Sequence, residues 1–207
     1  MSQKSFFVVL EGIDGSGTTT HSKLLYGFLK LLNLKVHLTQ EPSNNEIGLL
    51  LRKFLKNKEI PPSTDALMFA ADRDLHYKRE IKPKLDQGYI VISDRYVESS
   101  LIYQSLQSEE ISLDWVKLIN RFAAPPDLTV ILDIDPKIAL SRKTQEKLEK
   151  FEDTTFLDRV RALYLSRAKT NGYHLINSDD IIEIVQGKIQ KIVFEGLKSI
   201  GFEIKNK

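Results

Sequence analysis

The strongest chemical pattern in this 207-residue chain is a glycine-rich segment that follows a short apolar run. It reads Gly12-Ile13-Asp14-Gly15-Ser16-Gly17-Thr18-Thr19-Thr20. A glycine-rich turn between a strand and a helix directs successive backbone N–H groups into one concavity, where the helix N-terminus adds partial positive charge. Such a turn binds phosphate. The segment matches the pattern G-x-x-x-x-G-K-[ST] at Gly12, Gly17 and Thr19, but Thr18 stands where the pattern has lysine. Taken alone, the segment leaves a turn without a ligand as the alternative.

Two further segments place charged and aromatic residues at informative spacings. In Met68-Phe69-Ala70-Ala71-Asp72-Arg73, Phe69 and Arg73 are four residues apart and share one face of a predicted helix. In Val91-Ile92-Ser93-Asp94-Arg95-Tyr96, a predicted strand ends at Asp94 and Arg95. Because open α/β sheets bind ligands at the carboxyl ends of their strands, this pair belongs to a candidate site.

These residues need a sheet to position them, and the chain supplies one. Five short, nearly continuous apolar segments are typical of parallel strands covered on both faces. They span residues 6–10, 36–39, 89–93, 128–134 and 173–176. Helical spacing of apolar residues follows at 24–32, 47–55, 63–85, 113–123, 136–147, 156–169 and 180–200. Strands alternating with helices predict an α/β fold with a parallel sheet and right-handed crossovers.

The composition narrows the class of protein. The chain has no cysteine, which excludes a disulfide scaffold, a thiolate metal site and a cysteine nucleophile. Its 42% hydrophobic residues suffice for one core, and its formal net charge is +2. We therefore expect one intracellular domain over residues 1–207, with no membrane span and no nucleic-acid partner.

The glycine-rich segment, FAADR at 69–73 and ISDRYVESSLIYQ at 92–104 occur here in the order and at the separations of the thymidylate kinases. The chain resembles that family of P-loop nucleoside monophosphate kinases over nearly its whole length, including Thr39-Gln40-Glu41-Pro42 and residues 126–133 and 142–164. The resemblance implies a P-loop kinase three-layer sandwich with a five-stranded parallel sheet. It also implies a cytoplasmic homodimer that transfers the γ-phosphoryl group of ATP to dTMP with Mg²⁺.

The resemblance implies a binding role for each residue around the acceptor base. Phe69 would stack on the thymine ring, and Arg73 would hydrogen-bond the base edge. Ser100 and Gln104 would also contact the base. Tyr103 would crowd the position of a ribose 2′-hydroxyl and so favour deoxyribose. A core aromatic residue is the alternative for Phe69, and a packing residue is the alternative for Tyr103.

The resemblance likewise implies which residues bind phosphates and metal. Arg95 and Arg52 would bind the dTMP phosphate, since a guanidinium grips two oxygens at once. Asp14 would lie beside the sugar and the acceptor phosphate. Thr19 and Asp94 would hold Mg²⁺. The residues implied to bind ATP are Gly12, Ile13, Asp14, Gly15, Ser16, Gly17, Thr18, Thr19, Thr20 and Arg142, and those implied to be catalytic are Asp14, Asp94, Arg95 and Arg142.

The departures from the family pattern concern charge. Besides Thr18, the chain has Gln40 where the family often has Arg, and Ser43-Asn44 where it often has Gly-Gly. Family members with Gly at the position of Gly15 carry basic residues in a lid over ATP. We therefore expect a lid at about 141–155 to replace the missing lysine.

Within that lid, Arg142 is the first candidate for the replacement, ahead of Lys143, Lys147 and Lys150. Lys23 is a poor substitute on sequence grounds because it lies more than a helical turn inside the following helix. A solvated basic face is the alternative for the lid cations.

Three alternative functions are weighed against a thymidylate kinase. A pseudokinase would keep the pocket without the chemistry, although the retained Asp14, Thr19, Asp94 and Arg95 argue against it. A nucleoside monophosphate kinase with broader acceptor specificity is a second alternative. A regulatory GTPase is disfavoured because the chain has no N-K-x-D motif.

Overall fold

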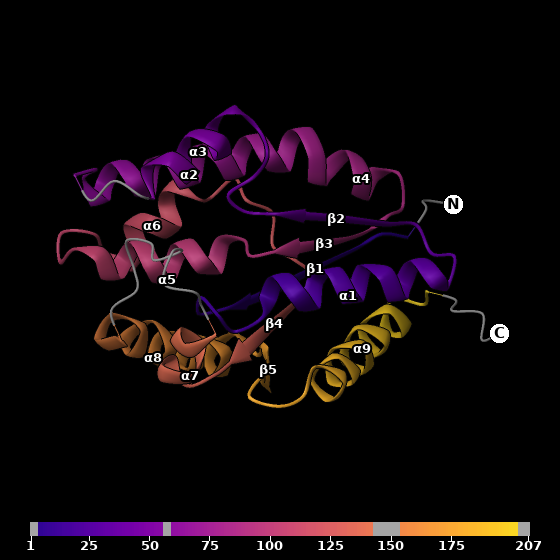
Figure 1. The fold of residues 1–207 in the computed structure, drawn as a ribbon. Coiled ribbons are helices and arrows are strands. Elements are labelled where there is room, and N and C mark those ends of the chain that lie inside the picture. The colour runs from indigo at the N-terminus through magenta and orange to yellow at the C-terminus, as the bar shows by residue number, and fades with distance from the viewer. Residues whose placement is uncertain (1–3, 56–58, 143–153, 203–207) are drawn as a thin grey trace.

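The computed structural model describes residues 4–55, 59–142 and 154–202. Its five strands form one parallel sheet in the order β2-β3-β1-β4-β5, so β1 lies in the middle (Figure 1). The strands are β1 Phe6–Gly12, β2 Val36–Gln40, β3 Ile90–Asp94, β4 Leu128–Asp133 and β5 His174–Asn177. The five predicted strands and the predicted fold class are confirmed.

Helices cover both faces of the sheet and make the fold a three-layer sandwich (Figure 1). On one face lie α1 (Thr18–Leu31) and α9 (Ile182–Ser199). The remaining helices are α2 Glu46–Phe54, α3 Pro62–His76, α4 Lys82–Asp86, α5 Val97–Gln107, α6 Leu113–Ile119, α7 Pro136–Ser141 and α8 Thr154–Asn171. Along 4–55, 59–142 and 154–202, no helix is both long and apolar enough to cross a bilayer.

The central strand is buried along its whole length. Successive side chains of a strand point to opposite faces, so Val8 and Leu10 pack in the core under α1 and α9. Phe7 and Val9 pack on the other side with Ile81 and Tyr96. Burial on both faces explains the continuous apolar run in the sequence, and it fixes the loop after β1 at the middle of the sheet edge.

The helix predicted over 63–85 is interrupted by a π-helical turn. Between α3 and α4 lies η1 (Tyr77–Ile81), in which the backbone N–H of Lys82 donates to the carbonyl of Tyr77, five residues back. Pro83 follows, and a proline can neither donate a hydrogen bond nor tolerate the carbonyl four residues before it. A wider turn at this point relieves that clash.

Two other predicted helices differ from the structure. The helix predicted over 113–123 ends at Ile119, so α6 is only 7 residues long. The helix predicted over 136–147 forms α7 to Ser141, and its remainder from 143 lies outside the described residues. Most of the predicted lid, 141–155, falls outside them as well.

Helix α2 packs unusually close to the turn after β2. Asn45 caps the helix by accepting from the backbone N–H groups of Ile47 and Gly48. A Cβ built on Gly48 would lie 2.1 Å from the carbonyl oxygen of Ser43. This close approach sets the distance between α2 and the turn, which therefore requires glycine at position 48.

We predict that Gly48→Ala lowers the free energy of unfolding by about 1 to 3 kcal/mol, because backbone atoms must move to admit the methyl group. Gly27→Ala is the matched control, since a Cβ on Gly27 of α1 meets nothing within 4 Å. There alanine should stabilise by roughly 0.4 to 1 kcal/mol. Urea unfolding of both variants measures the difference, and an equal response at the two positions would contradict the predicted contact.

Candidate active site

The loop after β1 has the conformation of a phosphate-binding turn. Gly17, which precedes α1, has a left-handed backbone with φ of 97°, and α1 begins at Thr18. Gly15 also has a positive φ of 84°, and a Cβ there would lie 2.4 Å from the carbonyl oxygen of Ala139. The loop opens into a cavity of about 590 Å³, which we call the P-loop cavity. Its walls include the loop, the N-terminus of α1, Arg95, Arg142 and the segment 178–182.

A hydroxyl and a carboxylate meet where the loop and β3 converge. The Oγ1 of Thr19 donates to Oδ2 of Asp94 at 2.5 Å. Asp94 is 8% exposed, and its Oδ1 is buried without a hydrogen-bond partner. Mg²⁺ in nucleotide sites keeps several waters and takes one or two protein oxygens beside the phosphates. This pair fits such an ion, and the described residues contain no cluster of three His, Asp or Glu that could hold a metal by itself.

A second, smaller cavity of about 110 Å³ lies beside the first, and we call it the aromatic cavity. Phe69 enters it from α3, and Ser100, Tyr103 and Gln104 enter it from α5. Gln104 is 2% exposed, and its Oε1 has no hydrogen-bond partner. A buried acceptor without a donor costs free energy unless a ligand supplies one. The residues predicted to contact the base, Phe69, Arg73, Ser100 and Gln104, therefore line one cavity, together with Tyr103, which is predicted beside the sugar.

Arg73 is more deeply embedded than its predicted role requires. It is 1% exposed, and its guanidinium forms an ion pair of 2.7 Å with Glu41. It also donates to Oδ1 of Asn120 and to Oγ of Ser100. Removing one partner of a buried ion pair leaves an uncompensated charge. Arg73 is thus a structural organiser of the cavity wall as well as a candidate ligand.

Arg95 lines both the aromatic cavity and the P-loop cavity, as Asp14 also does. Its backbone is left-handed with φ of 69°, which turns the chain sharply after β3. Its guanidinium donates to the carbonyl of Gly12 at 2.7 Å and to Oδ1 of Asp14 at 2.5 Å. The positive charge therefore lies at the boundary between the two cavities, next to the phosphate loop.

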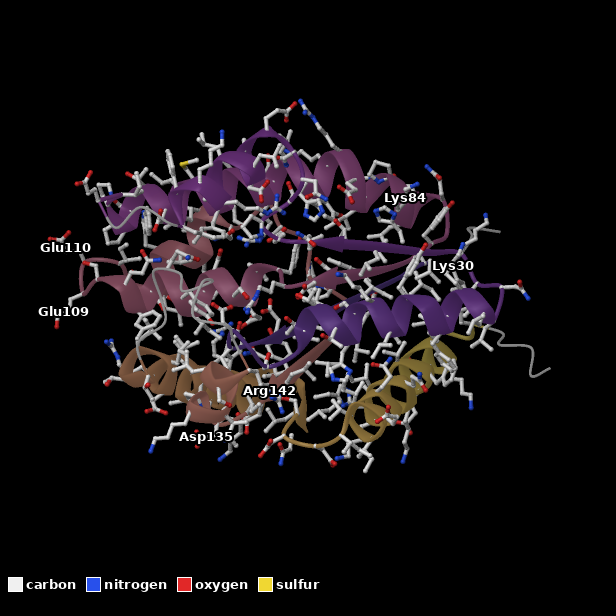
Figure 2. All side chains as sticks on the ribbon, viewed as in Figure 1. Lys30, Lys84, Glu109, Glu110, Asp135 and Arg142 are labelled. Carbon is white, nitrogen blue, oxygen red and sulfur yellow. The ribbon has the colours of Figure 1, made fainter. Side chains whose placement is uncertain are left out.

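Two predicted phosphate ligands occupy peripheral positions. Arg52 donates to the carbonyl of Pro42 and to Asn44, and it does not line the aromatic cavity. Arg142, labelled in Figure 2, lines the P-loop cavity but donates to the carbonyl of Ser178 and pairs with Asp179 at 3.5 Å. The other lid candidates, Lys143, Lys147 and Lys150, lie outside the described residues.

No pattern in the sequence marked Glu11, a residue of β1 whose carboxylate joins β1 to the start of α5 and to α8. Glu11 is fully buried, and its carboxylate accepts from the backbone N–H groups of Tyr96 and Ser99. It also accepts from the hydroxyls of Ser99 and Tyr164, the latter 153 residues away. Burial raises the pKa of Glu11 to about 7, although the hydrogen bond from Ser99 and the charge of Arg95 oppose the shift. Glu11 thereby anchors the start of α5, which carries Ser100, Tyr103 and Gln104.

A parallel sheet with a glycine-rich loop after its central strand and an adjoining cavity lined by aromatic and polar side chains defines the class of P-loop nucleoside monophosphate kinases. Comparison with known proteins gives the particular family. The family model described as Thymidylate kinase matches residues 10–189, and the chain belongs to the thymidylate kinase family.

Individual relatives agree with that family. A protein of Pyrobaculum calidifontis named probable thymidylate kinase is 49% identical, with 83% of this chain and 87% of the relative covered. One of Pyrobaculum aerophilum with the same name is 46% identical, with 90% and 95% covered. One of Sulfurihydrogenibium sp., named thymidylate kinase, is 34% identical, with 93% and 97% covered.

We predict that Glu11 makes stability fall as pH rises from about 4.5 to 7. The ordinary pKa of 4.5 applies to the unfolded chain and the pKa of about 7 to the folded one, so the folded state binds more protons in this window. The contribution is on the order of 3 kcal/mol. Glu11→Gln should remove it, because glutamine does not ionise there.

Urea unfolding of wild type and Glu11→Gln at pH 5 and pH 7 measures the effect. The difference between the two proteins isolates Glu11 from other titrating groups. An identical pH dependence in both would mean that Glu11 ionises at its ordinary pKa.

Proposed function

We propose that this chain transfers the γ-phosphoryl group of ATP to dTMP, giving ADP and dTDP. The observation that carries the proposal is the shared wall of the two cavities. Asp14 and Arg95 line both, so a donor in the P-loop cavity and an acceptor in the aromatic cavity would meet at one guanidinium. Family membership supports the same reaction.

The donor side uses the phosphate loop. Backbone N–H groups at Gly15, Gly17 and Thr18 and the N-terminus of α1 favour the ATP phosphates there. Arg142 would contact the nucleotide near the segment 178–182, to which its guanidinium is tied. Mg²⁺ at Thr19 and Asp94 would neutralise charge on the phosphates, and the unpartnered Oδ1 of Asp94 supports its presence.

The acceptor side uses the aromatic cavity. The ring of Phe69 offers a stacking surface for thymine, and the unpartnered Oε1 of Gln104 offers an acceptor for the thymine N3–H. Arg73 and Ser100 line the same wall. The hydroxyl of Tyr103 accepts from the backbone N–H of Asp14 at 3.2 Å, which supports its proposed place beside the sugar.

The residues at the boundary position the reacting groups. An oxygen of the dTMP phosphate attacks the γ-phosphorus, and the bond from that phosphorus to the oxygen bridging the β-phosphate breaks. The attacking oxygen already carries negative charge, so no side chain need remove a proton. Arg95 would bind the acceptor phosphate and hold it in line, which is the main demand of phosphoryl transfer.

Two alternatives are less well supported. A pseudokinase would keep the ligand-binding acceptors on Asp94 and Gln104 as well, so it is the placement of Asp14 and Arg95 in the wall between the two cavities that argues against it. Broader acceptor specificity has no support of its own in the lining of the aromatic cavity, where Phe69 and Gln104 suit a thymine ring. A cytoplasmic location and a lid at 141–155 stay predictions.

We also propose that two copies associate through α3 and α6. Leu67 of α3 is 51% exposed, and Leu118 and Phe122, on α6 and just after it, are 58% and 59% exposed. The Nζ of Lys78 lies 5.6 Å from the ring centroid of Phe122. Helix α3 packs against α6, so the exposed Leu67 and Leu118 lie on neighbouring elements. Exposed apolar patches of this kind are typical of interfaces.

We predict ADP formation from ATP with dTMP, and little with purine monophosphates. Arg95→Ala should lower kcat/KM for dTMP by roughly 10²-fold or more, because it loses the charge at the boundary. Arg52→Ala is the matched control and should lower it by less than about tenfold, because Arg52 contacts the turn at Pro42.

A coupled assay of ADP release over a panel of monophosphates measures both effects, with thermal unfolding as the check on folding. Wild-type protein without activity on any monophosphate would favour the pseudokinase. Equal effects of the two arginine substitutions would remove Arg95 from the acceptor site.

For the proposed dimer, we predict that Leu67→Glu combined with Phe122→Glu yields monomers in sedimentation velocity, because like charges would face one another across the interface. Leu31→Glu is the control, since Leu31 is 81% exposed at the end of α1. A wild-type protein that sediments as a monomer would contradict the proposed dimer.

A further inference from the structure

The P-loop cavity lacks an uncommitted cation among the described residues. Thr18 is neutral and 5% exposed. His21 donates or accepts a hydrogen bond of 2.8 Å with Gln186, and burial lowers its pKa, so it is neutral at pH 7. Arg95 is bound to Gly12 and Asp14, and Arg142 is bound to Ser178 and Asp179. The charge that a P-loop lysine brings to the γ-phosphate is therefore missing from this cavity.

A third cavity, of about 140 Å³, adjoins the P-loop cavity at Thr19, which lines both. We call it the Lys23 cavity. Its wall also includes Asp94 and Ser22, each with a buried oxygen that has no hydrogen-bond partner. The only cation that lines it, within the described part of the chain, is Lys23.

Lys23 can reach the level of Thr19. The two residues are four apart on α1 and so lie on one face of the helix. Long helical side chains lean toward the N-terminus, so the lysine side chain covers the turn that carries Thr19. One turn rises about 5.4 Å, which a lysine side chain spans. Counting residues along the helix disfavours Lys23, but the direction of its side chain brings its ammonium back to the start of α1.

The surroundings of Lys23 leave its charge available. Its side chain is exposed and forms no hydrogen bond or ion pair with any residue in the described ranges. Asp94 and Glu80 line the same cavity and favour an ammonium there. Gln40 and Asn44 also line it, so the amide that replaces the family's frequent arginine at position 40 puts no competing cation beside Lys23.

We propose that the ammonium of Lys23 contacts the γ-phosphate of the donor nucleotide from the side of Thr19 and supplies the charge that Thr18 lacks. The proposal rests on the phosphoryl transfer proposed above. In that reaction the electron pair of the breaking bond moves to the β-phosphate oxygen of ADP, and Lys23 keeps its proton throughout. Two departures from the family pattern, at positions 18 and 40, then have one physical explanation.

Lys23→Met tests the proposal, with Lys23→Arg as the charge-retaining variant and Lys30→Met as the matched control on α1. Lys30 is exposed and lies at the far end of the helix (Figure 2). We expect Lys23→Met to lower kcat about 10²- to 10³-fold with an unchanged KM for dTMP. Lys23→Arg should stay within about tenfold of wild type, and Lys30→Met should match wild type. An unchanged kcat in Lys23→Met overturns the proposal.

Nucleotide binding in EDTA gives a readout that needs neither turnover nor metal. By calorimetry, Lys23→Met should weaken ATP binding about tenfold while ADP binding changes less than about twofold, because only ATP has the γ-phosphate. Arg142→Met should weaken ATP and ADP alike. A loss confined to ATP in Arg142→Met, with none in Lys23→Met, returns the role to Arg142 and overturns the proposal.

A double-mutant cycle between positions 18 and 23 completes the test. If Lys23 performs the missing lysine's task, Lys23→Met costs less activity in a Thr18→Lys background, and additive losses overturn the proposal. Failure of the function itself is distinguishable, because wild-type protein would then release no ADP with dTMP. The binding experiment in EDTA still decides the role of Lys23 in that case.

Discussion

The arrangement of the loops at the carboxyl ends of the strands depends on the guanidinium of Arg95. Its side chain binds the carbonyl of Gly12 and the carboxylate of Asp14, and its backbone N–H donates to Leu10 at 2.9 Å. These contacts join the ends of β1 and β3. Glu11 adds a second connection, because its carboxylate accepts hydrogen bonds from the backbone N–H groups of Tyr96 and Ser99 at the start of α5. The glycine-rich loop and α5 are thereby held at a fixed separation, and the two cavities acquire a common wall.

The parts of the site that follow from local sequence were predictable. Apolar runs marked all five strands, and the glycine spacing marked the loop because glycine is needed where the backbone is left-handed. The spacing of Phe69 and Arg73 placed both on one helix face. The structure brings these residues to one cavity.

Polar partners brought together by the fold were not predictable. Glu41 neutralises Arg73 across 32 residues, and Tyr164 meets Glu11 across 153. A single sequence shows that Arg73 needs a partner but not which carboxylate supplies it. For Arg52, the sequence predicts the helix but not the contact of the side chain, which donates to the carbonyl of Pro42. Lys23 was set aside because position along a helix says less than the direction of the side chain.

The close approach of Gly15 to the backbone of Ala139 also limits which substitutions the glycine-rich loop can accept during evolution. An arginine at position 15, found elsewhere in the family, is one way to bring charge to the phosphate loop. Here any side chain at that position would overlap the backbone of α7 at 2.4 Å. Adding that arginine therefore requires α7 to shift first, and such a shift has no benefit on its own. The two changes are mutually dependent, so single substitutions that restore charge are confined to other positions around the loop.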